Sequence, residues 1–98
     1  MKRLDAITCL EARAPDVARR GATALFLYGS TGRDEAGNDS DVDLFIDYDI
    51  EGRFNAFDLV GLKLYLENQL GAPVDLTTRD SLHPALRSQI EATAIRVF

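Results

Sequence analysis

An alternating stretch in the middle of the chain constrains its fold most. Across residues 41–47 (DVDLFID), the apolar residues Val42, Leu44 and Ile46 recur at every second position, and acids occupy most of the places between them. A period of two is that of a β-strand with one buried and one polar face. The run at residues 24–28 (ALFLY) contains no charged residue and predicts a strand that is covered on both faces. The chain is therefore expected to fold around a sheet.

Segments with apolar residues at helical spacing lie before and after these strands in the sequence. Residues 3–20 show it with an interruption at Pro15, which predicts two short helices. Residues 54–70 carry two sets at helical spacing and predict one helix with a broad apolar stripe on the sheet: Phe57, Val60 and Leu64, and Leu62, Leu66 and Leu70. A strand at 74–76, a helix at 84–91 and a strand at 94–98 complete the pattern. We expect an α/β (α+β) fold, a small mixed β-sheet with helices packed on one face.

Length and charge exclude several classes of protein. A chain of 98 residues has room for one domain, residues 1–98. Eleven basic and 16 acidic residues give a net charge of -5, which argues against affinity through a nucleic-acid backbone. No apolar run approaches the roughly 20 residues that span a bilayer, and the single cysteine, Cys9, has no internal disulfide partner. We expect a cytoplasmic protein that binds neither membrane nor nucleic acid directly.

The polar face of the alternating strand carries Asp41 and Asp43, two residues apart and therefore on the same side. Carboxylates this close raise each other's pKa, and a bound cation relieves the repulsion. Ligation by oxygen atoms alone selects a hard ion such as Mg²⁺. An isolated Asp-x-Asp is more often only the solvent-facing side of a strand. The interpretation therefore depends on what lies nearby.

The turn before this strand supplies that context. Gly29 and Ser30 directly follow the apolar run, and ten residues separate Ser30 from Asp41. Glycine lets the backbone approach a phosphate closely, and Ser30 offers a hydroxyl and an amide. Arg33, in the same loop, could hold a nucleotide phosphate or simply balance the acidic loop. A Gly-Ser pair alone is usually a plain turn, but together with the acids at this spacing it favours a phosphate-binding loop.

A third acidic candidate is Asp75, between the apolar Val74 and Leu76. If the strand at 74–76 joins the alternating strand, the carboxylate shares its polar face. The alternative is a charge that keeps an edge strand soluble. The pattern alone favours neither.

Two segments resemble a known family. Residues 25–49 (LFLYGSTGRDEAGNDSDVDLFIDYD) resemble the Gly-Ser-x10-Asp-x-Asp signature of the nucleotidyltransferase superfamily with a polymerase-beta-like fold, in its minimal-nucleotidyltransferase branch. Residues 70–98 look like the usual ending of that branch. One departure is visible, because the family's loop commonly reads Ala-Arg-Gly where this chain has Gly32-Arg33-Asp34.

The resemblance implies a site and a reaction. Asp41, Asp43 and Asp75 would be the catalytic, Mg²⁺-binding acids, and Gly29, Ser30 and Arg33 would hold the phosphates of ATP. Members of this branch are commonly antitoxins that transfer AMP to a small helical toxin of the HEPN type. That implies a hetero-oligomer in which a tyrosine hydroxyl of the toxin is the acceptor. Two alternatives stay open: a non-catalytic module that neutralises its partner by contact alone, and a transferase that acts on a small molecule.

Overall fold

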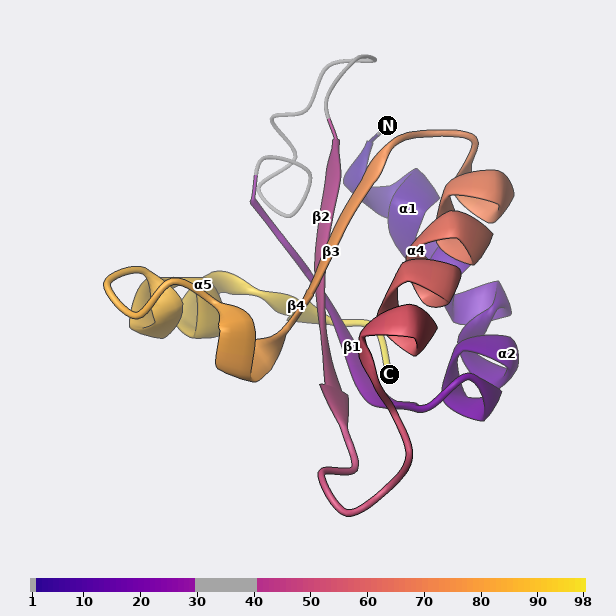
Figure 1. The fold of residues 1–98 in the computed structure, drawn as a ribbon. Helices are drawn as coiled ribbons and strands as arrows, with labels where there is room; N and C mark the ends of the chain where they lie inside the picture. The colour runs from indigo at the N-terminus through magenta and orange to yellow at the C-terminus, as the bar shows by residue number, and fades with distance from the viewer. Residues whose placement is uncertain (1, 30–40) are drawn as a thin grey trace.

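The computed structural model describes residues 2–29 and 41–98 (Figure 1). Four strands and several helices make up these described residues. In order they are α1 (Arg3–Ala12), α2 (Ala14–Arg19), β1 (Ala22–Tyr28), β2 (Val42–Tyr48), α4 (Ala56–Leu70), β3 (Val74–Thr78), the 3-10 helix η1 (Arg79–Ser81), α5 (Arg87–Thr93) and β4 (Ile95–Arg96).

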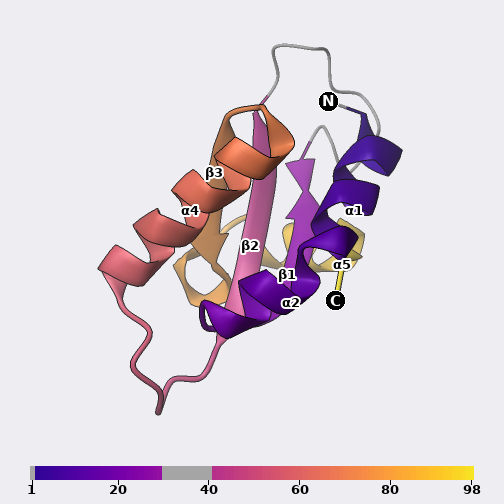
Figure 2. The ribbon, with the colours of Figure 1, turned by 90° about the vertical axis from the view of Figure 1, so that its right-hand side faces the viewer.

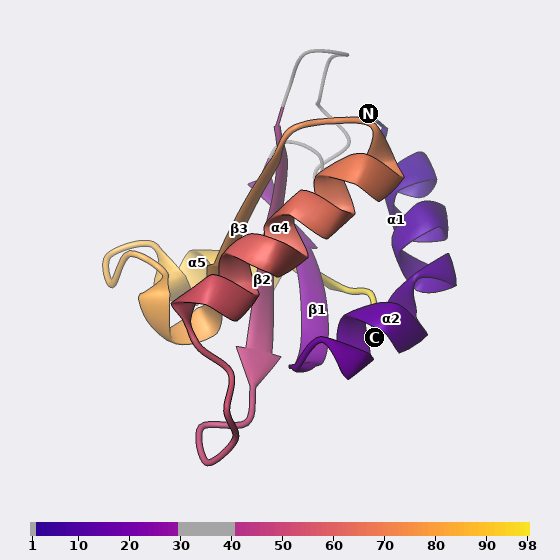
Figure 3. The ribbon, with the colours of Figure 1, turned by 45° about the vertical axis from the view of Figure 1, so that its right-hand side comes forward.

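The strands form one mixed sheet in the order β3-β2-β1-β4. β1 runs antiparallel to both β2 and β4, whereas β3 is parallel to β2. A parallel pair needs a crossover connection, and α4 supplies it. α1, α2 and α4 lie together on one side of the sheet, and α5 lies on the other side (Figures 2 and 3). The expected mixed sheet with a helical layer is confirmed, and α5 is an addition on the opposite face.

The two faces of β2 differ as its alternating sequence predicts. Val42, Leu44 and Ile46 are fully buried under the helical layer. Asp43 and Asp47 lie at the alternate positions and are only partly buried. Phe45 is buried as well, although it belongs to the acidic face, because its ring stacks on Phe26 with centroids 4.6 Å apart. The acidic face of the sheet therefore carries a small aromatic cluster of its own.

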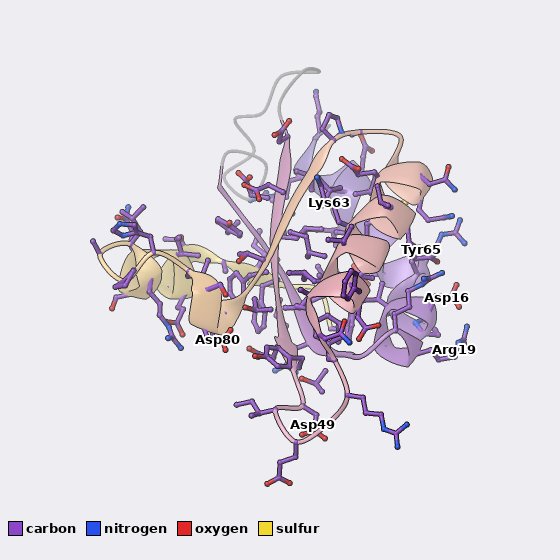
Figure 4. All side chains as sticks on the ribbon, in the orientation of Figure 1. Asp16, Arg19, Asp49, Lys63, Tyr65 and Asp80 are labelled. Carbon is purple, nitrogen blue, oxygen red and sulfur yellow. The ribbon has the colours of Figure 1, made fainter. Side chains whose placement is uncertain are left out.

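The N-terminal segment forms the two predicted short helices. Pro15 lies in the first turn of α2, where its missing N–H costs no hydrogen bond. Tyr65 ties α4 to α2, because its hydroxyl donates to the Asp16 carboxylate over 3.0 Å (Figure 4). The Arg20 guanidinium also lies 4.1 Å from the centre of the Tyr65 ring. Within the described ranges, no helix is both long and apolar enough to cross a membrane.

α4 has clear local start and stop signals. Asn55 accepts hydrogen bonds from the Phe57 and Asp58 amides, and the Asp58 carboxylate accepts one from the Asn55 amide, so the two residues form a capping box. At the other end, Gly71 ends the helix with a φ of 67°, a left-handed conformation that glycine adopts without strain.

The prediction of a broad buried stripe on α4 is half wrong. Leu62, Leu66 and Leu70 pack against the sheet as expected. The other set faces away from it, with exposed fractions of 88% for Phe57, 55% for Val60 and 59% for Leu64. The reason is geometric, since α4 lies in a single layer and the sheet covers only one side of the helix.

This difference within one helix can be measured. Leu66→Ala should lower the free energy of unfolding by about 2–5 kcal/mol, because the side chain is 0% exposed and its removal leaves a cavity. Leu64→Ala, the matched control two residues away on the exposed face of the same helix, should change it by less than about 0.5 kcal/mol. Urea unfolding followed by circular dichroism gives both values. Equal costs would mean that the outer face of α4 is covered.

Candidate active site

Three polar side chains form a row across the sheet on the face opposite α4. Antiparallel pairing sets Tyr28 of β1 beside Asp43 of β2, and parallel pairing sets Asp75 of β3 on the other side of Asp43. Residues that are directly paired point to the same face. The neighbours of Asp75, Val74 and Leu76, are buried, so its carboxylate takes the polar face. We call these three residues, the two acids Asp43 and Asp75 with Tyr28 at one end, the carboxylate row.

The negative charges in this row are close enough to affect one another. Burial is the main cause that raises the pKa of Asp43, and the charges of Asp75 and Asp41 add to it. Burial likewise raises the pKa of Tyr28 to about 12, with further contributions from Asp43 and Asp75. Asp41 itself lies exposed, immediately before β2. The environment of Asp43 therefore disfavours its ionised form unless a positive charge is added.

Gly29, at the end of β1, touches the central acid of the row. Its φ of 72° is left-handed, and a β-carbon at this position would lie 3.0 Å from Cγ and 3.2 Å from Cβ of Asp43. Any side chain here would therefore push the carboxylate aside. The sequence suggested that Gly29 serves a phosphate, and the geometry adds that it leaves room for Asp43. Ser30 and Arg33, the other predicted phosphate ligands, lie outside the described residues.

The donor set fits a magnesium ion that substrate helps to bind. Within residues 2–29 and 41–98, no three acidic, histidine or cysteine side chains are already gathered around one point. Mg²⁺ is usually held by one or two carboxylates and by substrate phosphates, so a closed cage of protein ligands is not required. Asp43 and Asp75 supply carboxylate oxygens from adjacent strands, and Asp41 immediately precedes β2. These three residues would hold the ion.

An ionic cluster below the row holds α5 against the sheet. The Arg79 guanidinium donates to both oxygens of Asp47, at 2.7 and 3.1 Å, and to Glu91 of α5 at 2.7 Å. Those carboxylates, Asp47 first, raise the pKa of Arg79 above its usual value. The guanidinium also lies 4.8 Å from the centre of the Phe26 ring. The sequence does not single out Arg79, because nothing in its neighbours indicates that it reaches back to β2.

Arg79→Ala should destabilise the protein by about 1.5–3 kcal/mol, since the change leaves Asp47 without its charged donor and removes one of the two that Glu91 has. Arg87 provides a matched control, because among the residues that the structure describes it donates only to Glu91, over 2.9 Å and one helical turn away. Arg87→Ala should cost at most about 0.5 kcal/mol. Urea unfolding measures both variants. Similar losses would mean that the contact with Asp47 contributes little.

Sequence comparison places the chain among enzymes that transfer nucleotides. Residues 10–97 match the nucleotidyltransferase domain family. A relative in Methanocaldococcus jannaschii, assigned to the protein adenylyltransferases, is 36% identical over 84 residues, which are 86% of this chain and 88% of that protein. Protein adenylyltransferase MntA of Thermococcus cleftensis is 37% identical over 78 residues, or 80% of this chain and 73% of that protein.

Solved structures share the fold. A protein described as a minimal nucleotidyltransferase has a TM-score of 0.75 and 39% identity, with 97% of this chain and 95% of that chain covered. The MNT antitoxin found in complex with a tri-AMPylated HEPN toxin from Shewanella oneidensis has a TM-score of 0.64. It is 18% identical, with 100% of this chain and 72% of that chain covered. This similarity concerns the fold.

Proposed function

The chain belongs to the nucleotidyltransferase domain family and is a nucleotidyltransferase, and from this premise we propose that it transfers AMP from ATP to a tyrosine hydroxyl of a HEPN-type toxin. In this proposal the chain is a cytoplasmic, Mg²⁺-dependent antitoxin that forms a hetero-oligomer with its target. The observation that carries the reaction is the alignment of Asp43 and Asp75 on adjacent strands, with Gly29 directly beside Asp43.

The names of similar proteins support the substrate and the partner. Two relatives more than 35% identical to the chain are protein adenylyltransferases by name, which supports a protein as the acceptor of AMP. A HEPN toxin occurs with an MNT antitoxin in the Shewanella oneidensis complex, and another toxin-antitoxin structure of the same fold contains AMP-PNP. These similarities favour ATP as the donor and a HEPN-type protein as the acceptor.

Each acid in the row has a distinct place in the proposed reaction. Bound Mg²⁺ would supply positive charge to the phosphates and polarise their oxygens. Asp43, central and partly buried, would face the α-phosphate. Asp75 is exposed on the edge strand β3, so an acceptor can approach it from solvent. Gly29 would let the phosphates approach the backbone beside Asp43.

The transfer itself is an in-line substitution at phosphorus. The phenolic oxygen of the acceptor attacks the α-phosphorus, and its proton passes to the carboxylate of Asp75. The bond between the α-phosphorus and the oxygen that bridges to the β-phosphate breaks, and its electron pair leaves with pyrophosphate. The products are an AMP ester of tyrosine and free pyrophosphate.

Label transfer tests the proposal. The chain is incubated with ATP labelled at the α-phosphate, Mg²⁺ and the HEPN-type protein encoded beside it, and the label on each protein is followed by electrophoresis. We expect label on the toxin, loss of that label with EDTA, and a large decrease with Asp75→Asn. A stable complex that suppresses toxicity without label would indicate a binding module instead. Label on a small molecule alone would exclude the protein acceptor.

A further inference from the structure

A hollow lies between the end of β1 and α5, next to the carboxylate row. Its volume is about 220 Å³, and it is lined by Tyr28, Gly29, Leu86, Gln89, Ile90 and Thr93. Sites that enclose whole drug-sized ligands usually have about 300–1,000 Å³. This hollow therefore has room for a ring system rather than for a complete nucleotide.

α5 presents two chemically different faces. One face holds the helix to the sheet, because Arg87 and Glu91 belong to the ionic cluster around Arg79. The other face lines the hollow, with residues spaced as one side of a helix: Leu86, Gln89, Ile90 and Thr93. No residue of α5 is buried. The helix is thus fixed by ionic contacts while its second face stays open toward Tyr28.

The walls of the hollow suit a flat heteroaromatic ring. Tyr28 contributes an aromatic side chain, and Leu86, with 51% of its surface exposed, contributes an aliphatic one. The side-chain amide of Gln89 makes no hydrogen bond to another residue of the described part. Both its N–H donors and its carbonyl acceptor are therefore available to a ligand. Apolar walls with a few polar groups, here Gln89 and Thr93, are typical of a site for a planar ligand that carries hydrogen-bonding atoms on its rim.

The position of the hollow distinguishes the donor nucleotide from the acceptor. Gly29 is part of its lining and directly follows β1, whereas Asp75 lies on β3, on the far side of β2. In the proposed reaction the phosphates lie at Gly29 and the acceptor enters at Asp75. A ring linked to the phosphates can reach the hollow without crossing the path of the acceptor.

We infer that this hollow receives the base of the donor nucleotide and that Gln89 selects adenine. A glutamine amide can donate to one ring nitrogen of adenine and accept from its amino group at the same time. The inference rests on the proposed function, since it concerns the nucleotide used in that reaction. It makes Gln89 a specificity-determining residue outside the carboxylate row.

Binding measurements without an acceptor test this inference. Equilibrium dialysis with labelled ATP or GTP and Mg²⁺ is compared for the native chain, Gln89→Glu and Ser88→Ala. Gln89→Glu should weaken ATP binding at least about tenfold, because a carboxylate accepts from the amino group but cannot donate to a ring nitrogen. GTP binding should weaken less or improve. Ser88 is exposed and does not line the hollow, so Ser88→Ala should leave both affinities unchanged.

A second variant distinguishes the contribution of the apolar wall of the hollow from that of Gln89. Leu86→Asn should weaken ATP and GTP binding alike, and because Leu86 is exposed the change should not unfold the protein. An unchanged ratio of ATP to GTP affinity in Gln89→Glu would overturn the inference. So would variants that raise only the KM for the toxin, because the hollow would then hold the acceptor's ring. A native chain that binds no nucleotide at all would instead contradict the proposed function.

Discussion

Asp43→Asn is expected to reduce AMP transfer by at least about a thousandfold and, at the same time, to raise the melting temperature of the metal-free protein. Activity falls because the central carboxylate of the row can no longer bind a cation. Stability rises because burial and the charges of Asp75 and Asp41 raise the pKa of Asp43, which means that its ionised form is unfavourable in the folded chain. Label transfer and thermal unfolding in EDTA measure the two effects.

The pH dependence of this stability gain has a definite sign. The pKa of Asp43 is higher in the folded chain than its ordinary value of 3.8. Between those two values the folded state holds a proton that the unfolded state has lost, so the stability of the native chain decreases as the pH rises through this window. Asparagine does not titrate. The difference in melting temperature should therefore be smallest near pH 4 and constant around neutrality.

Asp49→Asn is the control for net charge in this comparison. Asp49 lies in the turn after β2, where its side chain accepts a hydrogen bond from the Glu51 amide over 3.0 Å, and an asparagine oxygen can accept the same bond. The substitution removes one negative charge far from the row and should change neither activity nor its pH profile. If both variants gained equal stability, the effect would reflect net charge rather than the row.

The sequence predicts the face on which the carboxylates lie because strand geometry is local. A period of two in residues 41–47 fixes which side chains point away from the helices, whatever the sheet contains. The pairing of Asp43 with Asp75 depends on which strands become neighbours and in which register. The chain's alternation cannot specify that. For Asp75 the pattern left solubility and catalysis equally open, and the parallel register of β3 brought it beside Asp43.

Contacts between distant segments account for what the sequence did not predict. The two apolar sets of α4 have the same spacing and similar hydrophobicity, so periodicity could not distinguish the set that meets the sheet from Phe57, Val60 and Leu64. α5 begins later than the expected residues 84–91, because residues 84–86 form a turn after His83. Arg79 reaches Asp47 across 32 positions of sequence. No local pattern encodes such a pair.

Gly29→Ala is expected to lower AMP transfer about a hundredfold, as a misplacement of roughly 1 Å in a reacting group can do. The added β-carbon would press on the Asp43 carboxylate and move it out of line with Asp75. The protein should also lose about 1–3 kcal/mol of stability, because alanine is strained at a φ of 72°. Label transfer and urea unfolding measure the two losses.

The Gly71→Ala variant distinguishes the effect of backbone strain from the effect of the contact with Asp43. It has nearly the same conformation, with a φ of 67°, but nothing lies within 4 Å of the position that its β-carbon would take. Gly71→Ala should therefore show a comparable strain cost and full activity. If Gly71→Ala reduced activity as much as Gly29→Ala, general destabilisation would explain both. If Gly29→Ala kept full activity, the position of Asp43 beside Gly29 would have no part in the reaction.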